Sequence, residues 1–264
     1  MKSPDIISIG KSGIPKYIDI HCHVDLLKDP QETLRQADNQ DIGIVAATNT
    51  PSVFEFTAKI TSNTRYAQPA LGLHPQLVEE RAMELELMWQ LFNRTRFVGE
   101  IGLDYTDSRL DIRHRQMKVF NSILERCDAV GDKILIVHSR KATADVVSAI
   151  GENFRGTVIL HWYSGPKKIL EKAIQNGLYF SVNPAMLRSK QGNEIICMLP
   201  KDRVLTETDA PFVLVGHDPA KPLDVTRVIA KLAVIWGESE EKTRSLVMDN
   251  YRRCFNMAKD IHIS

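Results

Sequence analysis

The stretch KILIVHSRKATADVVSAIGENFRGTVILH, from Lys133 to His161, shows the pattern from which the fold is predicted. It opens with an apolar run over Lys133–His138, continues with a helix-like segment over Lys141–Glu152, and closes with a second apolar run over Thr157–His161. Short β-rich runs of this kind predict buried strands, and a helix between two of them predicts a parallel β–α–β unit. Both runs end on a histidine.

The same alternation extends along the chain in both directions. Six further runs predict strands over Tyr17–Cys22, Gly43–Thr48, Pro69–Leu73, Phe97–Leu103, Leu178–Val182 and Arg203–Asp209. Helical candidates lie between the runs, at Pro30–Gln40, Ser52–Ser62, Glu79–Asn93, Asp111–Ala129, Lys141–Glu152, Pro166–Asn176, Ser189–Leu199 and Leu223–Trp236. Eight such units in about 250 residues predict an α/β fold, a single (β/α)8 TIM barrel. A doubly wound open sheet is the alternative, but it normally has fewer strands and a GxGxxG loop, which does not occur here.

Composition excludes several classes of protein. The chain has 264 residues, of which 43% are hydrophobic and 25% charged, with a formal net charge of +1, so neither a disordered chain nor a disulfide-dependent miniprotein is expected. No run approaches the ~18 apolar residues of a membrane span, and the start of the sequence lacks the pattern of a signal peptide. The four cysteines form no CxxC pair. We therefore expect a cytoplasmic protein with free thiols and no membrane contact.

We expect one domain over residues 1–264, with the barrel over about 17–237 and an extra C-terminal helix over about 239–259. Ser239 can cap that helix, and apolar side chains such as Leu246, Tyr251 and Phe255 recur in it at helical spacing. We predict that this helix packs across the barrel exterior. The turn-rich segment Gly216–Pro222 predicts the loop after the eighth strand.

Six side chains that commonly bind metals gather at or near the carboxyl ends of the predicted strands. They are His21 and His23 in the first run, Glu100 in the fourth, His138 in the fifth, His161 in the sixth and Asp209 in the eighth. Active sites of barrel enzymes lie at that end of the fold, and strand alternation puts the two histidines of the HxH on one face. Such a set would repel or stay unsatisfied without cations, so it predicts divalent metal ions.

Taken singly, these residues have ordinary structural explanations. One histidine at the end of an apolar strand is more often a core or surface residue than a ligand, and only the joint pattern is specific. Four other residues are interpreted as structural, at loop, helix-face or terminal positions: Asp104, His114, His217 and His262.

Seven short segments occur in a characteristic order along the chain. They read DIHCHVD, GLHP, GEIGLDY, VHSRKA, HWYSG, TETDAPF and NYRRCF. In this order and spacing, from about Tyr17 to Ala258, the chain resembles the TatD-family metal-dependent deoxyribonucleases of the amidohydrolase superfamily. The TNTPS stretch at Thr48–Ser52 also resembles the TatD-like component of Qat antiphage cassettes.

The resemblance implies a site for two divalent metal ions. One ion would be held by His21, His23, Glu100 and Asp209, and the other by Glu100, His138 and His161, with Glu100 bridging. The histidine-rich set suits zinc or manganese, and magnesium could support turnover. Asp209 would orient or deprotonate the attacking water. Many amidohydrolases have a carbamylated lysine where this chain has Glu100, which favours phosphodiester hydrolysis.

Three more residues are candidates for supporting roles. Strand alternation predicts that Asp19 and Glu207 point the same way as the ligands that follow them, one step deeper, where they would fix an imidazole or a water. A purely structural role is the alternative for both. His74, in GLHP, would contact substrate phosphate or brace its own loop.

Basic and aromatic residues follow several strand ends, where a DNA backbone would enter. The basic ones are Arg140, Lys141, Lys167, Lys168, Arg188 and Lys190. Trp162 and Tyr163 are available for base stacking. Solvated surface positions are the ordinary alternative for such lysines. Two departures from the family stand nearby: Tyr163 replaces the usual phenylalanine, and FVLVGHDPAKPLDV, after TETDAP, lacks the arginine-and-asparagine sequence of many members.

The sequence therefore predicts a hydrolase of phosphodiester bonds in DNA, an exonuclease on single-stranded or frayed ends, with a role in antiphage defence and partner proteins from a defence cassette. One alternative is a metal-dependent amidohydrolase of a small cyclic amide or lactone, which needs a closed pocket rather than an open cationic groove. The other is a metal-binding barrel subunit that is active only in a larger assembly. The sequence leaves the oligomeric state open.

Overall fold

The computed structural model describes residues 14–257 and contains an eight-stranded parallel sheet in which neighbours along the chain are neighbours in space. The strands are β1 (Tyr17–Cys22), β2 (Ile42–Ala46), β3 (Ala67–Leu71), β4 (Phe97–Gly102), β5 (Ile134–His138), β6 (Thr157–His161), β7 (Tyr179–Val182) and β8 (Val204–Thr206). Hydrogen bonds join the last strand to the first: Thr206 Oγ1 donates to Ile18 O at 2.5 Å, and Asp209 N donates to His21 O at 2.9 Å. The predicted (β/α)8 barrel is confirmed.

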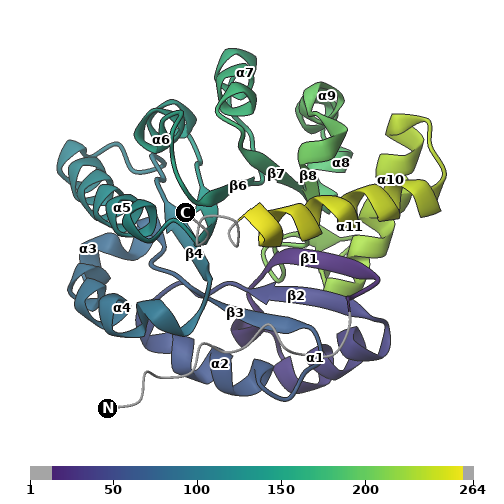
Figure 1. Ribbon diagram of the computed structural model, residues 1–264, viewed down its shortest axis with the longest axis horizontal. Helices are drawn as coiled ribbons and strands as arrows, with labels where there is room; N and C mark the ends of the chain where they lie inside the picture. Colours follow the sequence, from purple (N-terminus) through teal and green to yellow (C-terminus); the bar gives the residue numbers. More distant parts are fainter. Residues whose placement is uncertain (1–13, 258–264) are drawn as a thin grey trace.

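Helices surround the strands, as Figure 1 shows. They are α1 (Pro30–Asn39), α2 (Phe54–Thr61), α3 (Val78–Arg81), α4 (Leu85–Leu91), α5 (Leu110–Val130), α6 (Thr143–Ile150), α7 (Lys167–Gln175), α8 (Pro184–Arg188), α9 (Lys190–Met198), α10 (Val225–Trp236) and α11 (Glu240–Met257). The predicted helix over Glu79–Asn93 is divided into α3 and α4, because Arg81 leaves the helical region at φ −121° and ψ 7°. Helix α8 was not predicted.

The barrel interior is apolar at the amino ends of the strands. One buried cluster takes side chains from all eight strands: Ile18, Ile20, Val45, Ala70, Phe97, Ile134, Ile136, Ile159, Tyr179 and Leu205. Burial of this set removes apolar surface from water at roughly 25 cal/mol per Å², which is the main force that closes the barrel. The carboxyl ends of the strands are left for polar groups.

The C-terminal helix closes the amino end of the barrel. Val247, Met248, Tyr251 and Cys254 of α11 belong to the same buried cluster as the interior side chains of the strands. Figure 1 shows α11 lying across the ring of strands rather than beside the outer helices. Asn250 fixes it there, because its buried Nδ2 donates to Lys201 O at 2.9 Å and to Val204 O at 2.7 Å. The predicted helix thus packs across the barrel at its amino end, and the predicted end at about residue 259 lies outside the described residues.

The segment after β8 contains a short hairpin that the sequence did not predict. Its strands, β9 (Leu214–Val215) and β10 (Asp218–Pro219), pair antiparallel across Gly216, which takes a φ of +67°. Such a left-handed turn position favours glycine. Within residues 14–257, no helix has the length and apolar character that a membrane span requires.

Candidate metal centre

A β-bulge in β1 determines the direction in which the two histidines of the HxH point. Asp19 pairs with Ile44 of β2, whereas Cys22 pairs with Ala46, so β1 takes three steps where β2 takes two. Paired residues share a face of the sheet, and the extra residue therefore puts Asp19 and Cys22 on the same face. His21 and His23 converge on the mouth, with their Nε2 atoms 3.1 Å apart. The prediction that Asp19 points the same way as His21 is wrong, because strict alternation is broken between them.

A second β-bulge, in β4, determines the direction of the Glu100 side chain. In β4, Val98 pairs with Leu135 and Ile101 with Val137, so this strand also carries one extra residue opposite β5. The neighbouring backbone lies very close at this point. A Cβ atom built on Gly72 of the loop after β3 would lie only 2.4 Å from the Glu100 nitrogen, so glycine is required there. The bulge and the glycine together let a carboxylate enter the centre of the barrel mouth.

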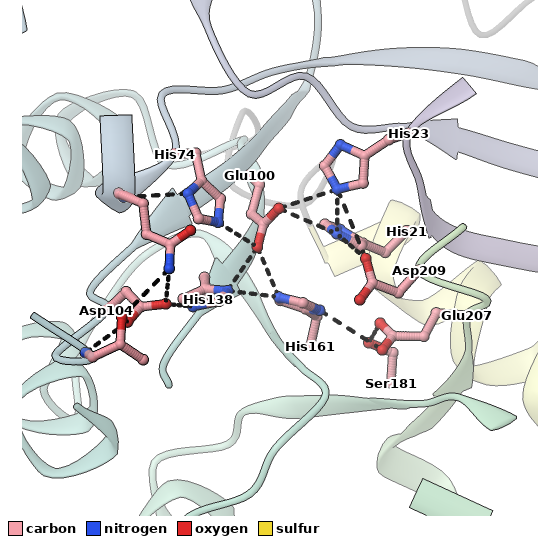
Figure 2. A network of polar contacts seen from close by, with 12 residues as sticks. His21, His23, His74, Glu100, Asp104, His138, His161, Ser181, Glu207 and Asp209 are labelled. Atoms are coloured by element: carbon pink, nitrogen blue, oxygen red, sulfur yellow. Dashed lines mark hydrogen bonds and ion pairs between the residues drawn. The ribbon is translucent and has the colours of Figure 1, made fainter. Parts of the chain in front are cut away.

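Glu100 lies at the centre of the polar cluster, as Figure 2 shows. Its Oε2 is 3.1 Å from His23 Nε2 and 3.5 Å from His21 Nε2. Its Oε1 is 2.8 Å from His138 Nδ1 and 2.9 Å from His161 Nε2. The two oxygens of one buried carboxylate therefore face two different pairs of imidazoles.

The spacing between the ligand atoms fits metal ions. His21 Nε2 lies 3.5 Å and His23 Nε2 lies 3.8 Å from Asp209 Oδ1, and His138 Nδ1 lies 3.2 Å from His161 Nε2. Ligands that bind one tetrahedral ion at ~2.0–2.1 Å stand roughly 3.3 Å apart. The Nδ1 atoms of His21 and His23 are buried without a hydrogen-bond partner among the described residues, and the Nε2 atoms point into the cluster. The donor set therefore fits divalent cations.

His74 belongs to this cluster. Its Nε2 lies 3.3 Å from Glu100 Oε1, and His74, Glu100 and His138 offer three ligand atoms within 4.8 Å of one another. Its Nδ1 accepts from Gln76 N at 3.2 Å, which fixes the ring. The structure thus brings His74 closer to the candidate ligands than the sequence predicted, while it stays accessible to a substrate in the cleft.

Interactions between the charged groups of the cluster shift their pKa values. Burial raises the pKa of Glu100, but the surrounding imidazoles outweigh burial and hold that pKa well below its usual range. Burial and His161 lower the pKa of His21, yet Glu100 and Asp209 outweigh them and raise it to about 9. Burial likewise lowers the pKa of His161, and Glu100 raises it above the ordinary histidine value. Without a metal, protons would take the place of the cations.

Asp104 holds the far side of His138. Its Oδ2 lies 2.9 Å from His138 Nε2, and its Oδ1 accepts from Thr106 N at 2.8 Å. Burial raises the pKa of Asp104, but the bond to His138 outweighs it, and the pKa falls to about 2. The interpretation of Asp104 as a plain loop residue is wrong. Its place two residues beyond β4 was the only sequence signal.

Glu207 and Asp19 support the site in different ways. Glu207 lies 3.7 Å from His161 Nδ1 and accepts from Asn183 Nδ2 at 2.9 Å and from the Ser181 hydroxyl, so it faces a candidate ligand as predicted. Asp19 accepts from Thr208 N at 2.9 Å and from Thr208 Oγ1 at 2.5 Å. It contacts no imidazole ring in these bonds. Asp19 instead closes the seam between β1 and the end of β8, which carries Asp209.

A cleft of about 510 Å³ opens beside the cluster. Its lining includes Glu100, His138, His161 and Asp209, together with Asn49, His74, Gln76, Leu77, Asp104, Arg140, Trp162, Ser164 and Phe212. Within this lining of described residues, Arg140 is the single Lys or Arg side chain. Lys141 and Lys168 are exposed elsewhere, and Lys167 pairs with Glu194 at 2.9 Å.

The prediction that Tyr163 stacks on bases is wrong. Tyr163 is only 1% exposed and packs in the main hydrophobic core, with an edge contact to Phe180. Its hydroxyl donates to Pro166 O at 2.8 Å. The preceding residue, Trp162, lines the cleft instead. Neighbours in the HWYSG segment therefore have opposite environments, one in the core and one at the mouth. His114 lies exposed on α5 as expected, and His262 falls outside the described residues.

A barrel whose polar mouth is built from imidazoles around one carboxylate belongs to the class of metal-dependent hydrolases. Comparison with known proteins specifies the family. The model of the TatD-related DNase family matches residues 18–256, and the chain belongs to that family.

Relatives match over nearly the whole chain. The zebrafish (Danio rerio) protein tatdn3 is 28% identical, over 92% of this chain and 98% of the relative. The metal-dependent hydrolase YjjV of Escherichia coli K12 is 27% identical, over 92% and 99% of the two chains. The crystal structure of YjjV, a TatD homologue, superposes with a TM-score of 0.83. The protein is therefore a metal-dependent hydrolase that acts on ester bonds.

The raised histidine pKa values predict that metal binding releases protons. At pH 7.5, a His21 side chain with a pKa of about 9 carries a proton that an entering Zn²⁺ or Mn²⁺ must displace. Calorimetric titration in buffers of different ionisation enthalpy should show about one proton or more released, and the number should fall as the pH approaches 9. His21→Ala should lower it, and His114→Ala should not. Binding without proton release at pH 7.5 would contradict this protonation state.

Proposed function

We propose that the protein is a two-metal phosphodiesterase, a deoxyribonuclease that removes nucleotides from single-stranded or frayed DNA ends. The observation that carries the proposal is the position of Glu100, whose two oxygens face separate pairs of imidazoles. A bridging carboxylate of this kind holds two cations about 3.5–4 Å apart, the separation used for in-line displacement at phosphorus.

The distances support two ligand sets. His21, His23, Asp209 and Glu100 Oε2 would hold one ion, and His138, His161 and Glu100 Oε1 would hold the other, with His74 beside it. Zinc or manganese suits this histidine-rich set, and magnesium could support turnover. When bound, such ions acidify an attacking water and neutralise phosphate oxygens.

The chain's own residues position the reaction. Asp209 lines the cleft, and its backbone is fixed by the bond from its nitrogen to His21 O at 2.9 Å. Its carboxylate orients the water and accepts its proton. Arg140 lines the same cleft and would bind the substrate phosphate through its guanidinium. Asp104 keeps the ring of His138 in place, and Glu207 places a negative charge beside the ring of His161.

The size of the cleft favours a second candidate function. A cleft of about 510 Å³ has the size of a small-molecule site, which would also suit a small cyclic amide or lactone. Glu100 argues against this alternative, because it stands where many amidohydrolases have a carbamylated lysine. A cleft of this size also suits a strand end better than a duplex, which agrees with exonuclease action.

The wider biological role also stays a proposal. Residues 1–264 would act as one cytoplasmic domain, in antiphage defence, with partner proteins from a defence cassette. A barrel subunit that works only inside such an assembly is the third candidate. Size-exclusion chromatography with and without the products of adjacent genes would distinguish it from a free enzyme.

A nuclease assay after metal analysis tests the proposal. The metal-loaded chain should shorten end-labelled single-stranded oligonucleotides stepwise and attack blunt duplexes more slowly. Hydrolysis of cyclic amides or lactones without any action on oligonucleotides would favour the second candidate.

Glu100→Gln should lose more metal than any single histidine variant. Glutamine keeps the shape of the side chain but removes the charge shared by both ligand sets, whereas His138→Ala or His161→Ala removes a ligand from one ion only. Elemental analysis after gel filtration measures the difference. Two ions per chain at wild-type affinity in Glu100→Gln would show that this carboxylate does not bridge.

Asp209→Asn should separate proton transfer from metal binding. Asparagine still offers a carbonyl oxygen but cannot accept the proton of water, so turnover should fall roughly 10²-fold or more. The ion held by His138 and His161 should remain. His21→Ala, which loses metal affinity, should be partly rescued by excess Zn²⁺ or Mn²⁺. Full rescue of Asp209→Asn by added metal would mean that the residue is only a ligand, and Glu207 and His74 would become the next candidates for the base.

The dependence of DNA affinity on salt should be shallow and should depend on Arg140. Each phosphate neutralised on a single strand contributes about 0.7 to the log–log slope. In the Asp209→Asn background, Arg140→Ala should lower the slope by about that amount, and Lys167→Ala, the matched control paired with Glu194, should leave it unchanged. A slope that responds to Lys167 and not to Arg140 would move the phosphate contact out of the cleft.

A further inference from the structure

Two aromatic side chains line the cleft and take no part in the metal centre. They are Trp162, directly after β6, and Phe212, in the segment after β8. Phe212 is 57% exposed, and Trp162 is partly exposed. Trp162 also packs against the hydrophobic core, so only part of its indole faces the cleft. Apolar surface that is exposed inside a cleft is typical of ligand contacts.

Backbone hydrogen bonds place Phe212 beside a candidate metal ligand. Its ring makes an edge contact with the ring of His23, at 5.1 Å between centroids. Its nitrogen donates to Asp209 O at 2.8 Å, and the next nitrogen, of Val213, donates to the same oxygen at 3.2 Å. Ala220 N donates to Val213 O at 2.7 Å, so the β9–β10 hairpin supports the segment from outside. The backbone of Phe212 is thus held at the rim of the cleft, and its largely exposed ring stands beside His23.

The backbone of Trp162 has a conformation that is unfavourable for a residue with a large side chain. Its φ of 41° lies in the left-handed region, which is unfavourable for a bulky side chain. Such a conformation persists only where the surroundings impose it, and it is frequent at ligand-binding sites. The residue directly follows His161, so the same turn that presents an imidazole to the metal centre presents an indole to the cleft.

The charge of the cleft explains why aromatic contacts are needed. Arg140 is the single Lys or Arg among the described residues of the lining. A nuclease that gains its affinity from phosphate neutralisation would need several such groups. Stacking of a base on an aromatic ring supplies affinity that does not depend on charge or on base identity.

We infer that Trp162 and Phe212 form a nucleobase subsite, which takes up the base of the nucleotide next to the scissile phosphate. The inference rests on the proposed function and gives it a substrate class: a single-stranded end whose last base is free to leave the stack. A duplex end would have to fray first.

Abasic substrates test the subsite directly. Single-stranded oligonucleotides that end in an ordinary nucleotide are compared with the same strands ending in an abasic tetrahydrofuran residue, with each end of the strand modified in turn. Wild-type kcat/KM should be at least about fivefold lower on the strand whose attacked end is abasic, the range that stacking on an aromatic ring supports. Phe212→Ala and Trp162→Ala should lose about that factor on the ordinary strand and little on the abasic one.

Matched variants separate stacking from structure. Phe56→Ala removes an aromatic side chain of similar exposure, 50%, from α2 outside the cleft lining and should behave as wild type on both strands. Phe212→Tyr and Trp162→Phe keep a flat ring and should keep most of the preference. If Trp162→Ala does not fold, Phe212→Ala carries the test, because its side chain is largely exposed.

Two results would overturn the subsite while leaving the nuclease intact. In one, the wild-type enzyme cleaves abasic and ordinary ends at equal rates. In the other, Phe212→Ala and Trp162→Ala lose the same factor on both strands, as expected for a purely structural effect. A wild-type protein that cleaves neither strand would instead overturn the proposed function, and the subsite with it.

Discussion

The buried carboxylate of Glu100 is the constraint on which the mouth of the barrel depends. Five imidazoles lie within 3.5 Å of its oxygens. A carboxylate withdrawn from water is costly unless opposite charge surrounds it, and neutral imidazoles become favourable neighbours only when a proton or a metal ion lies between the atoms. The cluster therefore requires cations, and its spacing fits metal ions as well as protons. The apolar core at the opposite end, sealed by α11, supplies the stability that this polar end does not.

The two bulges show how a regular barrel admits such a cluster. The pairing of β1 with β2 and of β4 with β5 fixes which side chains of each strand face the helices. Regular alternation along β1 and β4 would turn His21 and Glu100 toward the helices as well. One extra residue in each strand reverses the phase only at the carboxyl end. The amino ends keep their apolar pattern, so the core and the site are built from the same strands without conflict.

Sequence patterns predicted what depends on periodicity and composition. The eight strands, the (β/α)8 order and the placement of His21, His23 and Asp209 at one end of the barrel follow from the succession of strands and helices and from the position of strand ends. The face of the sheet on which Asp19 lies could not be predicted, because a β-bulge leaves no signal in an apolar run. The contact of Asp104 with His138 depends on the path of a loop, and the burial of Tyr163 depends on a single left-handed residue before it. The roles of the candidate ligands stay predictions of the sequence, now with distances that support them.

Strained backbone conformations are also concentrated near the carboxyl ends of the strands. Of the four non-glycine residues with positive φ in the described part of the chain, Lys141, Trp162 and Asp209 lie within three residues of the ends of β5, β6 and β8. Such conformations cost about 1–3 kcal/mol each and last only where surrounding contacts impose them. Strands that end at one rim must turn sharply there if a side chain is to face the axis while the chain departs toward a helix. The segment after β8 follows the most constrained of these turns, because Asp209 is bonded to β1 and then supports Phe212. Changes in that segment can therefore alter what the cleft accepts without moving the residues around Glu100.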